Sequence, residues 1–139
     1  MSREIKFRGR RKNGGSWIYG NLCNQDLTVC IFPQDAYDSY NNYIVDGSTV
    51  GQYTGLKDKN GVEIYEGDII MSNASTGKLI YHDIFYNEKQ AAFYAGLDGK
   101  RNASFGICNV YQQWINEFGK AVVGNIHENP ELLKGNNHE

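Results

Sequence analysis

Alternation of polar and apolar residues over short stretches is the feature that most limits what this chain can fold into. Near the N-terminus, Ile5 and Phe7 alternate with charged residues, and a period of two places successive side chains on opposite faces of a strand. We therefore expect Ile5 and Phe7 to point inward and their charged neighbours to point outward. Turn sequences rich in Gly and Asn separate further stretches of this kind. The predicted strands are a hairpin over 3–22, then 27–32, 49–56, 62–65, 68–71, 78–86, 91–97 and 121–126.

Helical periodicity is confined to two places. Apolar residues recur at i, i+3, i+4, i+7, i+8 and i+11 from Ile107 to Phe118, which predicts an amphipathic helix over 107–118. Asn129-Pro130-Glu131 is a helix-start pattern that predicts a single turn. Many short strands with little helix are typical of a small β-barrel or β-sandwich.

The chain length and the apolar runs limit the class of protein further. A chain of 139 residues is sufficient for one domain, or for one small domain with an additional lobe. No apolar run approaches the roughly 20 residues that span a bilayer, and the charged N-terminus does not resemble a signal peptide. We therefore expect a cytoplasmic protein without membrane contact. The polar loop at 34–43 is expected to separate an N-terminal β lobe from the rest of the chain.

Basic residues are concentrated at the N-terminus. Six of the fourteen Lys and Arg residues lie within the first twelve positions, although the formal net charge of the whole chain is −2. A basic, aromatic hairpin could contact nucleic acid. It could equally be a strand whose cations protect an exposed edge, and the acidic pI of 5.9 favours this second interpretation. The candidate nucleic-acid contacts are Arg3, Lys6, Arg8, Arg10, Arg11, Lys12, Trp17 and Tyr19.

Three tyrosines in the polar loop form a second candidate site. Tyr37, Tyr40 and Tyr43 are spaced three apart in a segment without a sustained apolar period. They could present a stacking surface to a partner macromolecule. They could also pack the loop onto the body of the protein, which is the commoner role of such residues.

Catalytic, metal and cofactor motifs are absent from the sequence. The three cysteines, Cys23, Cys30 and Cys108, are an odd number without zinc-site spacing, so we expect ordinary thiols and no metal. Asp35, Asp38 and Asp46 could gather as a metal site, but acidic loop residues are usually solvated. A cryptic enzyme would have to use Cys108 or a histidine such as His82 or His127. We predict no catalytic residues and no cofactor.

Several motifs together resemble the YopX family of phage and prophage proteins. They are YTGLKDKNG at 53–61, IYEGDII at 64–70 and VGNIHENPELL at 123–133, with REIKFR at 3–8 and WIYG at 17–20. This resemblance implies a mainly β protein with an SH3-like barrel, encoded by a phage or an integrated element and often oligomeric. It does not imply any particular activity. Segments 23–45 and 72–121 match the family motifs less closely, and partner choice is expected to lie there.

The resemblance and the residue patterns lead to one main hypothesis. We expect an N-terminal β lobe with a variable loop over 1–45, an SH3-like barrel over 46–133 and a flexible tail over 134–139. The leading function is a non-enzymatic accessory module that binds an unidentified host or phage macromolecule and forms a homo-oligomer, because open strand edges can be covered by copies of the same chain. The alternatives are nucleic-acid binding through the basic hairpin and a cryptic enzymatic activity.

Overall fold

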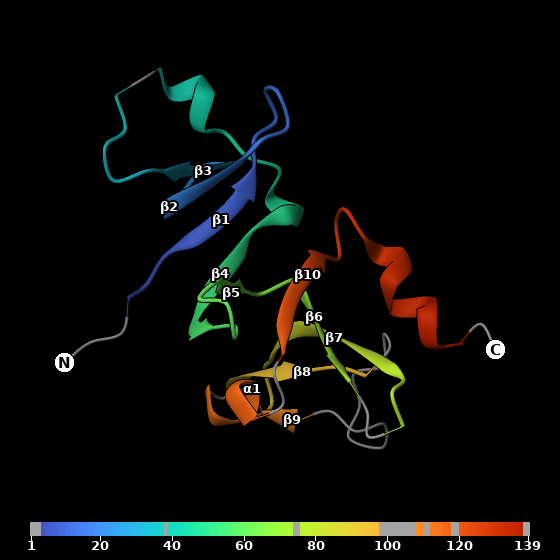
Figure 1. The fold of residues 1–139 in the computed structure, drawn as a ribbon. Coiled ribbons are helices and arrows are strands. Elements are labelled where there is room, and N and C mark those ends of the chain that lie inside the picture. The colour runs from blue at the N-terminus through green and yellow to red at the C-terminus, as the bar shows by residue number, and fades with distance from the viewer. Residues whose placement is uncertain are drawn as a thin grey trace. The chain divides into compact units, whose positions relative to one another are not determined.

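The computed structural model divides the chain into two compact units. Unit 1 is Met1–Gly55 and unit 2 is Leu56–Glu139, whereas the sequence placed a division at residues 45 and 46. The structure describes residues 4–37, 39–73, 76–97, 108–109, 112–117 and 120–137. Each unit is built on antiparallel strands, so the prediction of a mainly β protein with little helix is confirmed (Figure 1).

Unit 1 contains the predicted N-terminal hairpin. Strands β1 (Phe7–Arg10) and β2 (Trp17–Gln25) pair antiparallel, and positive φ angles at Gly14 and Gly15 allow the turn between them. Strand β3 (Thr28–Phe32) pairs with β2 and ends before Pro33, as expected. Two short 3₁₀ helices follow, η1 (Tyr40–Tyr43) and η2 (Gly47–Thr49), and then strand β4 (Gly51–Lys57), which pairs with β1 at its start.

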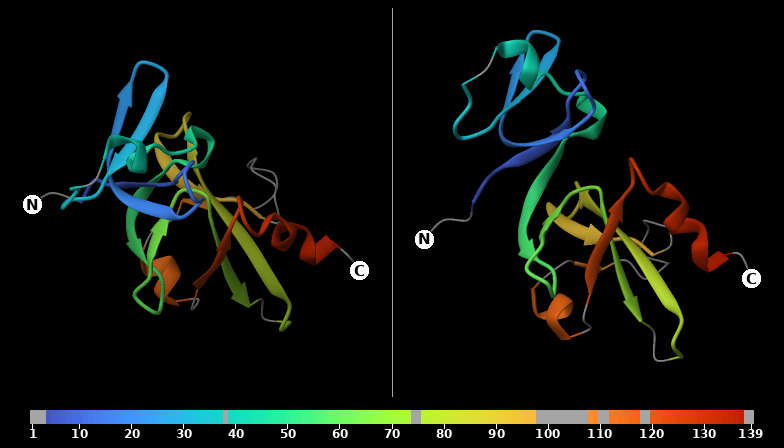
Figure 2. Two further views of the ribbon diagram at one scale, coloured as in Figure 1. Left: turned by 90° about the horizontal axis from the view of Figure 1, so that it is seen from above. Right: turned by 45° about the horizontal axis from the view of Figure 1, so that its top comes forward.

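Strand β2 changes its partner halfway along its length. Residues 17–20 pair with β1, and residues 21–25 pair with β3. The change occurs at Gly20, where an added Cβ would collide with the carbonyl oxygen of Phe32 and lie 2.7 Å from its carbonyl carbon. Only glycine allows this close backbone approach. The β2–β3 hairpin therefore projects past β1 (Figure 2).

The core of unit 1 is small. It contains Cys30, Ile31, Tyr43 and Val45, all buried. Gly9 lies directly over this cluster, because a Cβ at this position would be only 3.1 Å from atoms of both Ile31 and Val45. A close approach of this kind packs the central strand β1 against the core without a side chain of its own.

The predicted orientation of the side chains in and before β1 is wrong at two positions. Ile5 is 58% exposed, whereas Arg8 is only 6% exposed. The physical reason is the position of β1 between β2 and β4, which surrounds Arg8 but not Ile5, since Ile5 precedes the strand. The Arg8 guanidinium also lies over the Trp17 ring, 4.7 Å from its centroid, and such stacking tolerates a buried arginine.

Unit 2 contains the remaining strands and the α-helix. The main sheet has the order β10-β6-β7-β8-β9, with all described neighbours antiparallel. The elements are β5 (Glu63–Tyr65), β6 (Asp68–Asn73), β7 (Leu79–Asn87), β8 (Ala92–Ala95), β9 (Cys108–Asn109), α1 (Gln112–Glu117), β10 (Ala121–Asn125) and η4 (Pro130–Asn137). The turns predicted at Asn60-Gly61 and Glu66-Gly67 are present, with positive φ at both glycines.

Unit 2 has an aliphatic core without measurable exposure. Ile64, Ile70, Ile84, Ala95 and Ile115 form one cluster of fully buried residues from β5, β6, β7, β8 and α1. Helix α1 is also attached to the end of β4 by the Gln112 side chain, which bonds to one backbone N–H and one backbone carbonyl, as a neighbouring strand would. The Gln112 amide accepts a hydrogen bond from the Lys57 N–H at 3.1 Å and donates one to the Lys57 carbonyl at 2.6 Å.

Two finer expectations about unit 2 differ from the structure. The SH3-like barrel is not confirmed, because both sheets are open and no closed barrel exists among the described residues. The helix predicted over 107–118 is shorter: residues 108–109 form β9 and only 112–117 are helical, while 107, 110, 111 and 118 lie outside the described residues. Pairing of Cys108 and Asn109 with β8 satisfies backbone groups that a helix would otherwise use.

The C-terminal segment also differs from its prediction. The helix-start pattern at Asn129-Pro130 does begin a helix, but this helix is of the 3₁₀ type and extends to Asn137. It therefore includes residues 134–137 of the expected flexible tail, and 138–139 lie outside the described residues. None of the helices in the described part of the chain has the length and apolar character that crossing a membrane requires.

Candidate functional site

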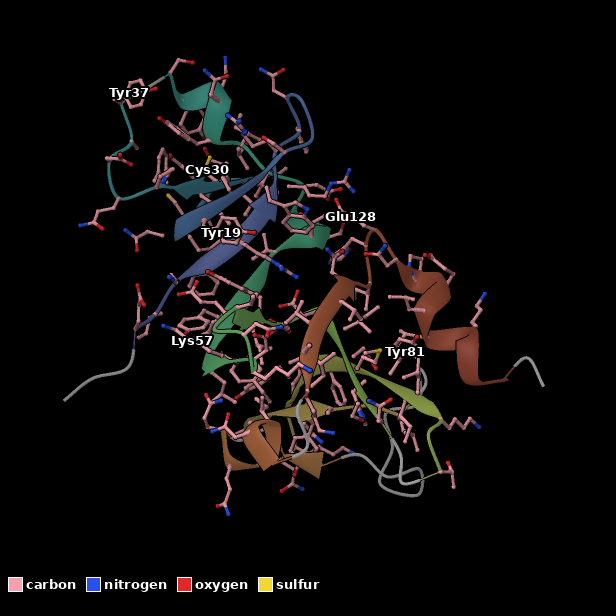
Figure 3. The ribbon with its side chains drawn as sticks, in the orientation of Figure 1. Tyr19, Cys30, Tyr37, Lys57, Tyr81 and Glu128 are labelled. Carbon is pink, nitrogen blue, oxygen red and sulfur yellow. The ribbon has the colours of Figure 1, made fainter. Side chains whose placement is uncertain are left out.

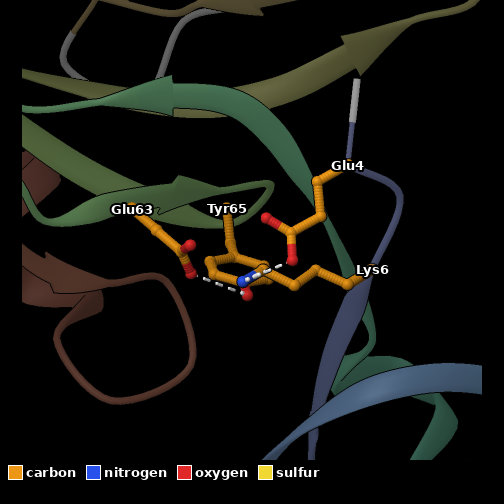
Figure 4. Close-up of polar contacts among 4 residues, drawn as sticks. All are labelled: Glu4, Lys6, Glu63 and Tyr65. Carbon is orange, nitrogen blue, oxygen red and sulfur yellow. Dashed lines mark hydrogen bonds and ion pairs between the residues drawn. The ribbon is translucent and has the colours of Figure 1, made fainter. Parts of the chain in front are cut away.

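The cations of the N-terminal hairpin are held by neighbours within unit 1. The Lys6 ammonium is 3.4 Å from the Glu4 carboxylate (Figure 4). It also lies 5.1 Å from the centroid of the Tyr53 ring. Arg10 Nε donates to the Gly15 carbonyl at 3.4 Å. These contacts, with the Arg8–Trp17 stack, direct the cationic groups toward the protein itself.

Arg11 is anchored in the same way. Its Nε donates to Ser16 Oγ at 2.9 Å, and its Nη1 donates to the Asn42 carbonyl at 3.3 Å, so Arg11 joins the hairpin to η1. Lys12 is exposed, and Arg3 lies outside the described residues. The predicted nucleic-acid contacts therefore do not form one outward-facing basic stripe among the described residues.

An open groove lies where β1 and β2 separate. It has a volume of about 450 Å³ and combines polar side chains with two exposed apolar ones, Ile5 and the 48% exposed Tyr19. The groove lies beyond the Phe7–Gly20 pair, where β1 and β2 no longer pair with each other. The lining residues are Glu4, Ile5, Lys6, Tyr19, Gly20, Asn21 and Gln34.

The three candidate tyrosines have different environments. Tyr37 is 90% exposed and lies on the outer side of its loop (Figure 3), and Tyr40 is partly exposed. Tyr43 is instead a core residue: its ring is 5.3 Å from the Phe32 ring, and its hydroxyl oxygen accepts a hydrogen bond from the Tyr37 N–H at 3.0 Å. Spacing of three therefore does not produce a continuous tyrosine surface here, because η1 turns Tyr43 inward.

A second, smaller hollow lies beside Tyr37. Its volume is about 230 Å³, and it is lined by Arg11, Ile18, Pro33, Asp35, Ala36, Tyr37 and Tyr43. Apolar and aromatic groups form its wall, and one cation and one carboxylate are placed among them. This combination of an aromatic side chain, apolar surface and a few charges is found at protein–protein interfaces.

Two of the thiols are cross-strand neighbours. Cys23 of β2 is directly opposite Cys30 of β3, and both are free; Cys30 is buried and Cys23 is partly exposed. The Tyr40 hydroxyl forms a hydrogen bond with Cys30, and this contact, followed by partial burial, raises the pKa of Tyr40 above its usual value of 10.0. The Cys108 side chain lies outside the described residues.

Unit 2 contains a serine–histidine contact that the sequence did not reveal. Ser72 Oγ is 3.0 Å from His82 Nε2, and His82 Nδ1 is 2.9 Å from the Gly96 carbonyl. A carbonyl only accepts, so Nδ1 carries the proton and Nε2 accepts from the serine hydroxyl. Both side chains are more than nine-tenths buried, which suits a structural link between β6, β7 and β8. Ser72 and His82 lie diagonally across two strands, so no sequence spacing identifies the pair.

Several carboxylates have structural roles. Asp58 accepts hydrogen bonds from the backbone N–H groups of Asn60 at 2.8 Å, Val62 at 2.9 Å and Val122 at 2.9 Å. It thereby closes the turn that the sequence predicted and attaches β10 to this turn. Glu63 accepts from the Tyr65 hydroxyl at 3.3 Å (Figure 4).

The candidate metal ligands are not grouped. Asp46 caps η2 by accepting from the Ser48 N–H at 3.0 Å, Asp35 lines the smaller hollow, and Asp38 lies outside the described residues. Within the described ranges, no three His, Cys, Asp or Glu side chains are close enough together to hold a metal ion. The His127 backbone N–H donates to Asn125 Oδ1 at 3.0 Å, in the turn after β10.

Comparison with known proteins identifies a family and a similar solved structure. The family model described as YopX protein matches residues 6–134. A search of curated proteins finds no match. The crystal structure of protein EF1440 from Enterococcus faecalis is similar, with a TM-score of 0.60 and 29% sequence identity. The alignment covers 95% of this chain and 99% of that protein.

Proposed function

This chain belongs to the YopX protein family, and from that premise we propose that it is an accessory module that acts by binding another macromolecule without catalysing a reaction. In this proposal the chain is encoded by a phage or prophage, acts in the cytoplasm of the bacterial host and forms a homo-oligomer. The bound macromolecule is a protein, and it docks at the smaller hollow of unit 1 beside Tyr37.

The exposure of Tyr37 beside this hollow is the observation that carries the proposal. Tyrosine is enriched among the residues that dominate binding energy, and a 90% exposed tyrosine next to apolar surface can bury a large area on a partner. Arg11 and Asp35 would supply the polar rim that such interfaces have. Tyr37 also lies in segment 23–45, one of the two segments that match the family motifs less closely.

The contacts that the basic side chains make within unit 1 favour a protein, and not a nucleic acid, as the binding partner. Arg8, Arg10 and Arg11 each have a stacking or hydrogen-bonding contact within unit 1. Binding a phosphate backbone would have to exchange these contacts for phosphate contacts, which reduces the net gain. Polar groups of unit 2 that catalysis could use, such as His82 and Asp58, are likewise hydrogen-bonded within the fold.

Affinity capture with matched variants tests this proposal. The full-length chain, its Tyr37→Ser variant and its Lys12→Gln variant are used as baits in infected cells, with and without nuclease. We expect a protein that survives nuclease treatment and binds the parent and Lys12→Gln equally. The Tyr37→Ser variant should bind it at least about tenfold more weakly, as expected for a dominant interface residue.

The opposite pattern would refute the proposal. Loss of all captured material on nuclease treatment, together with weaker capture by Lys12→Gln, would indicate nucleic-acid binding. Lys12 is the appropriate position for this control because it is exposed, whereas a Gln at the buried Arg8 would disturb the fold. Equal capture by the parent and Tyr37→Ser would place the docking surface elsewhere.

A further inference from the structure

The outer half of strand β2 has one edge that no described strand covers. Strand β1 pairs with β2 only as far as Gly20, and residues 21–25 pair with β3 on the opposite side. Residues 4–6, which lead into β1, do not continue this pairing: they belong to no strand, and the last pair of β1 with β2 is Phe7–Gly20. Among the described residues, the edge from Leu22 to Gln25 is therefore open.

The direction of the backbone groups along this edge follows from two hydrogen bonds. The Val29 carbonyl accepts from the Val45 N–H at 3.0 Å, so Val29 directs its polar groups away from β2. Bonded and non-bonded pairs alternate in an antiparallel ladder, so Asn24, opposite Val29, also directs its N–H and C=O outward. Two residues earlier, Leu22 does the same. The bond from the Arg11 N–H to the Ser16 carbonyl gives the same alternation from the other end of β2.

This edge lacks the usual protection against strand pairing. Proteins normally place Lys, other charged residues or Pro on exposed edges. The sequence of β2, from Trp17 to Gln25, contains no charged residue and no proline. Two copies of the edge can therefore approach each other without charge repulsion.

An exposed leucine lies at the end of the same hairpin. Leu27, in the two-residue turn between β2 and β3, has an exposure of 101%, so nothing in the described chain covers it. At the other end of the open edge is the groove of about 450 Å³ that Ile5, Tyr19 and Asn21 line. A projecting apolar side chain and an amphipathic groove thus bracket one open strand edge.

We propose that two copies of this chain associate through the open edge of β2, antiparallel about a two-fold axis at Cys23, with Leu27 of each copy in the partner's groove. Leu22 is then opposite the partner's Asn24, and their outward N–H and C=O groups pair with each other. Gln25 is opposite the partner's Asn21, so the Leu27 turn comes next to the groove that begins there. Such an interface is isologous, as two-fold symmetry requires.

The register makes a specific statement about Cys23. Leu22 and Asn24 form the bonded pairs across the axis, so Cys23 and the partner's Cys23 form the intervening non-bonded pair. Cα atoms in such pairs are about 4.5 Å apart, which is within the range that a disulfide spans. This self-association specifies the oligomer within the proposed function, and it uses a surface distinct from the Tyr37 hollow.

The interface is tested by measuring the molar mass, in solution, of the full chain and of two pairs of variants, each pair consisting of a disruptive substitution and a conservative control. Sedimentation equilibrium of the full chain should give twice the chain mass of 15.7 kDa. Asn24→Pro removes an outward N–H that β3 does not use, and we expect it to be a monomer, while Asn24→Ser stays dimeric. Leu27→Asp should weaken the dimer at least about tenfold, while Leu27→Met should not, because only the former loses apolar burial. Circular dichroism of each variant verifies that the fold is intact.

Cross-linking tests the register. In a chain with Cys30→Ala and Cys108→Ser, copper–phenanthroline and dissolved oxygen should oxidise the two Cys23 thiols to a disulfide, with oxygen accepting the electrons. A covalent dimer should form, and Cys23→Ser should abolish it. A dimer that does not cross-link through Cys23 would overturn the proposed register.

Other outcomes would overturn the interface itself. A mass of 15.7 kDa at all concentrations would do so, and so would dimers that persist in both Asn24→Pro and Leu27→Asp. The proposed docking function is judged separately. Tyr37→Ser is expected to change capture of a partner protein but not the mass of the chain, so failure of one proposal is distinguishable from failure of the other.

Discussion

The two units of the chain differ in the size of their cores and in their most exposed apolar side chains. Unit 2 buries a continuous aliphatic cluster and also buries polar groups, such as Asp58 and His82, that hydrogen-bond strands and turns together. Unit 1 has a smaller core and leaves Ile5, Leu27 and Tyr37 exposed. This difference is the reason why both proposed binding surfaces are assigned to unit 1.

Truncation within the unit 2 core should have the largest effect on stability. Ile84 is fully buried between β6 and β8, so Ile84→Ala removes apolar burial and leaves a cavity. We expect the free energy of unfolding of unit 2 to fall by about 2–5 kcal/mol, measured by urea denaturation. Leu27→Ala is the matched control in unit 1. Because Leu27 is fully exposed in a single chain, its loss should change the stability of the monomeric chain, measured at concentrations too low for dimers, by no more than about 0.5 kcal/mol; a larger change would show that Leu27 contributes to the core of unit 1.

Removal of the Asp58 carboxylate tests whether polar groups hold unit 2 together. Asp58→Ala leaves three backbone N–H groups without their acceptor, on residues 60, 62 and 122. Charge-assisted hydrogen bonds are stronger than neutral ones, so we expect a loss of about 2–4 kcal/mol in the free energy of unfolding. Asp58→Asn keeps one acceptor oxygen and should lose less. Hydrogen exchange should show selective opening of β10, whereas unchanged protection at Val122 would refute the attachment of β10 by Asp58.

Substitution of Gly20 tests the partner change in unit 1. Gly20→Ala introduces a Cβ against the backbone of Phe32 and Pro33, which cannot move away as a flexible side chain can. We expect a loss of about 1–3 kcal/mol in the stability of unit 1, measured by hydrogen exchange along β2 and β3. Gly55→Ala is a useful comparison, since no atom lies within 4 Å of its Cβ position and only its positive φ is unfavourable. Equal effects of the two substitutions would show that close approach at Gly20 is not the determining factor.

The smallest expected effect concerns the Tyr40 hydroxyl. Its hydrogen bond with Cys30, then partial burial, raises its pKa above 10.0, so the folded state holds this proton more tightly than the unfolded chain does. The resulting stabilisation is fully present below pH 10 and is lost as the pH rises through the folded-state pKa. Titration by ¹³C NMR of the tyrosine ring carbons should place Tyr40 above 10.0, and Cys30→Ala should lower that value. If Cys30→Ala left the pKa of Tyr40 unchanged, the Cys30 thiol would not be the cause of the raised pKa.

Local sequence signals were sufficient to predict many of the strands and turns of unit 1 and the turns of unit 2. The hairpin around Gly14 and Gly15, the end of β3 before Pro33 and the turn at Asn60-Gly61 were all predicted, because each depends on backbone preferences of the residues themselves. The family was recognised from longer motifs, one of which, at 53–61, contains the Asn60-Gly61 turn. Burial of a side chain, by contrast, depends on which strands lie beside it and not on backbone preferences. For this reason Arg8 was wrongly predicted to point outward and Ile5 was wrongly predicted to point inward.

The sequence by itself determined the approximate positions of the strands other than β9 and the positions of the main turns, since these follow from side-chain alternation and from the φ angles that Gly, Asn and Pro favour. Only the tertiary structure decided which strands became neighbours. It made 108–109 a strand instead of part of a helix, joined Ser72 to His82 across two strands, and left one edge of β2 open after Gly20. The physical reason is that pairing between distant segments depends on which hydrogen-bonding groups and side-chain volumes meet in space. A period or a spacing along the chain describes each segment alone and contains no information about its neighbour.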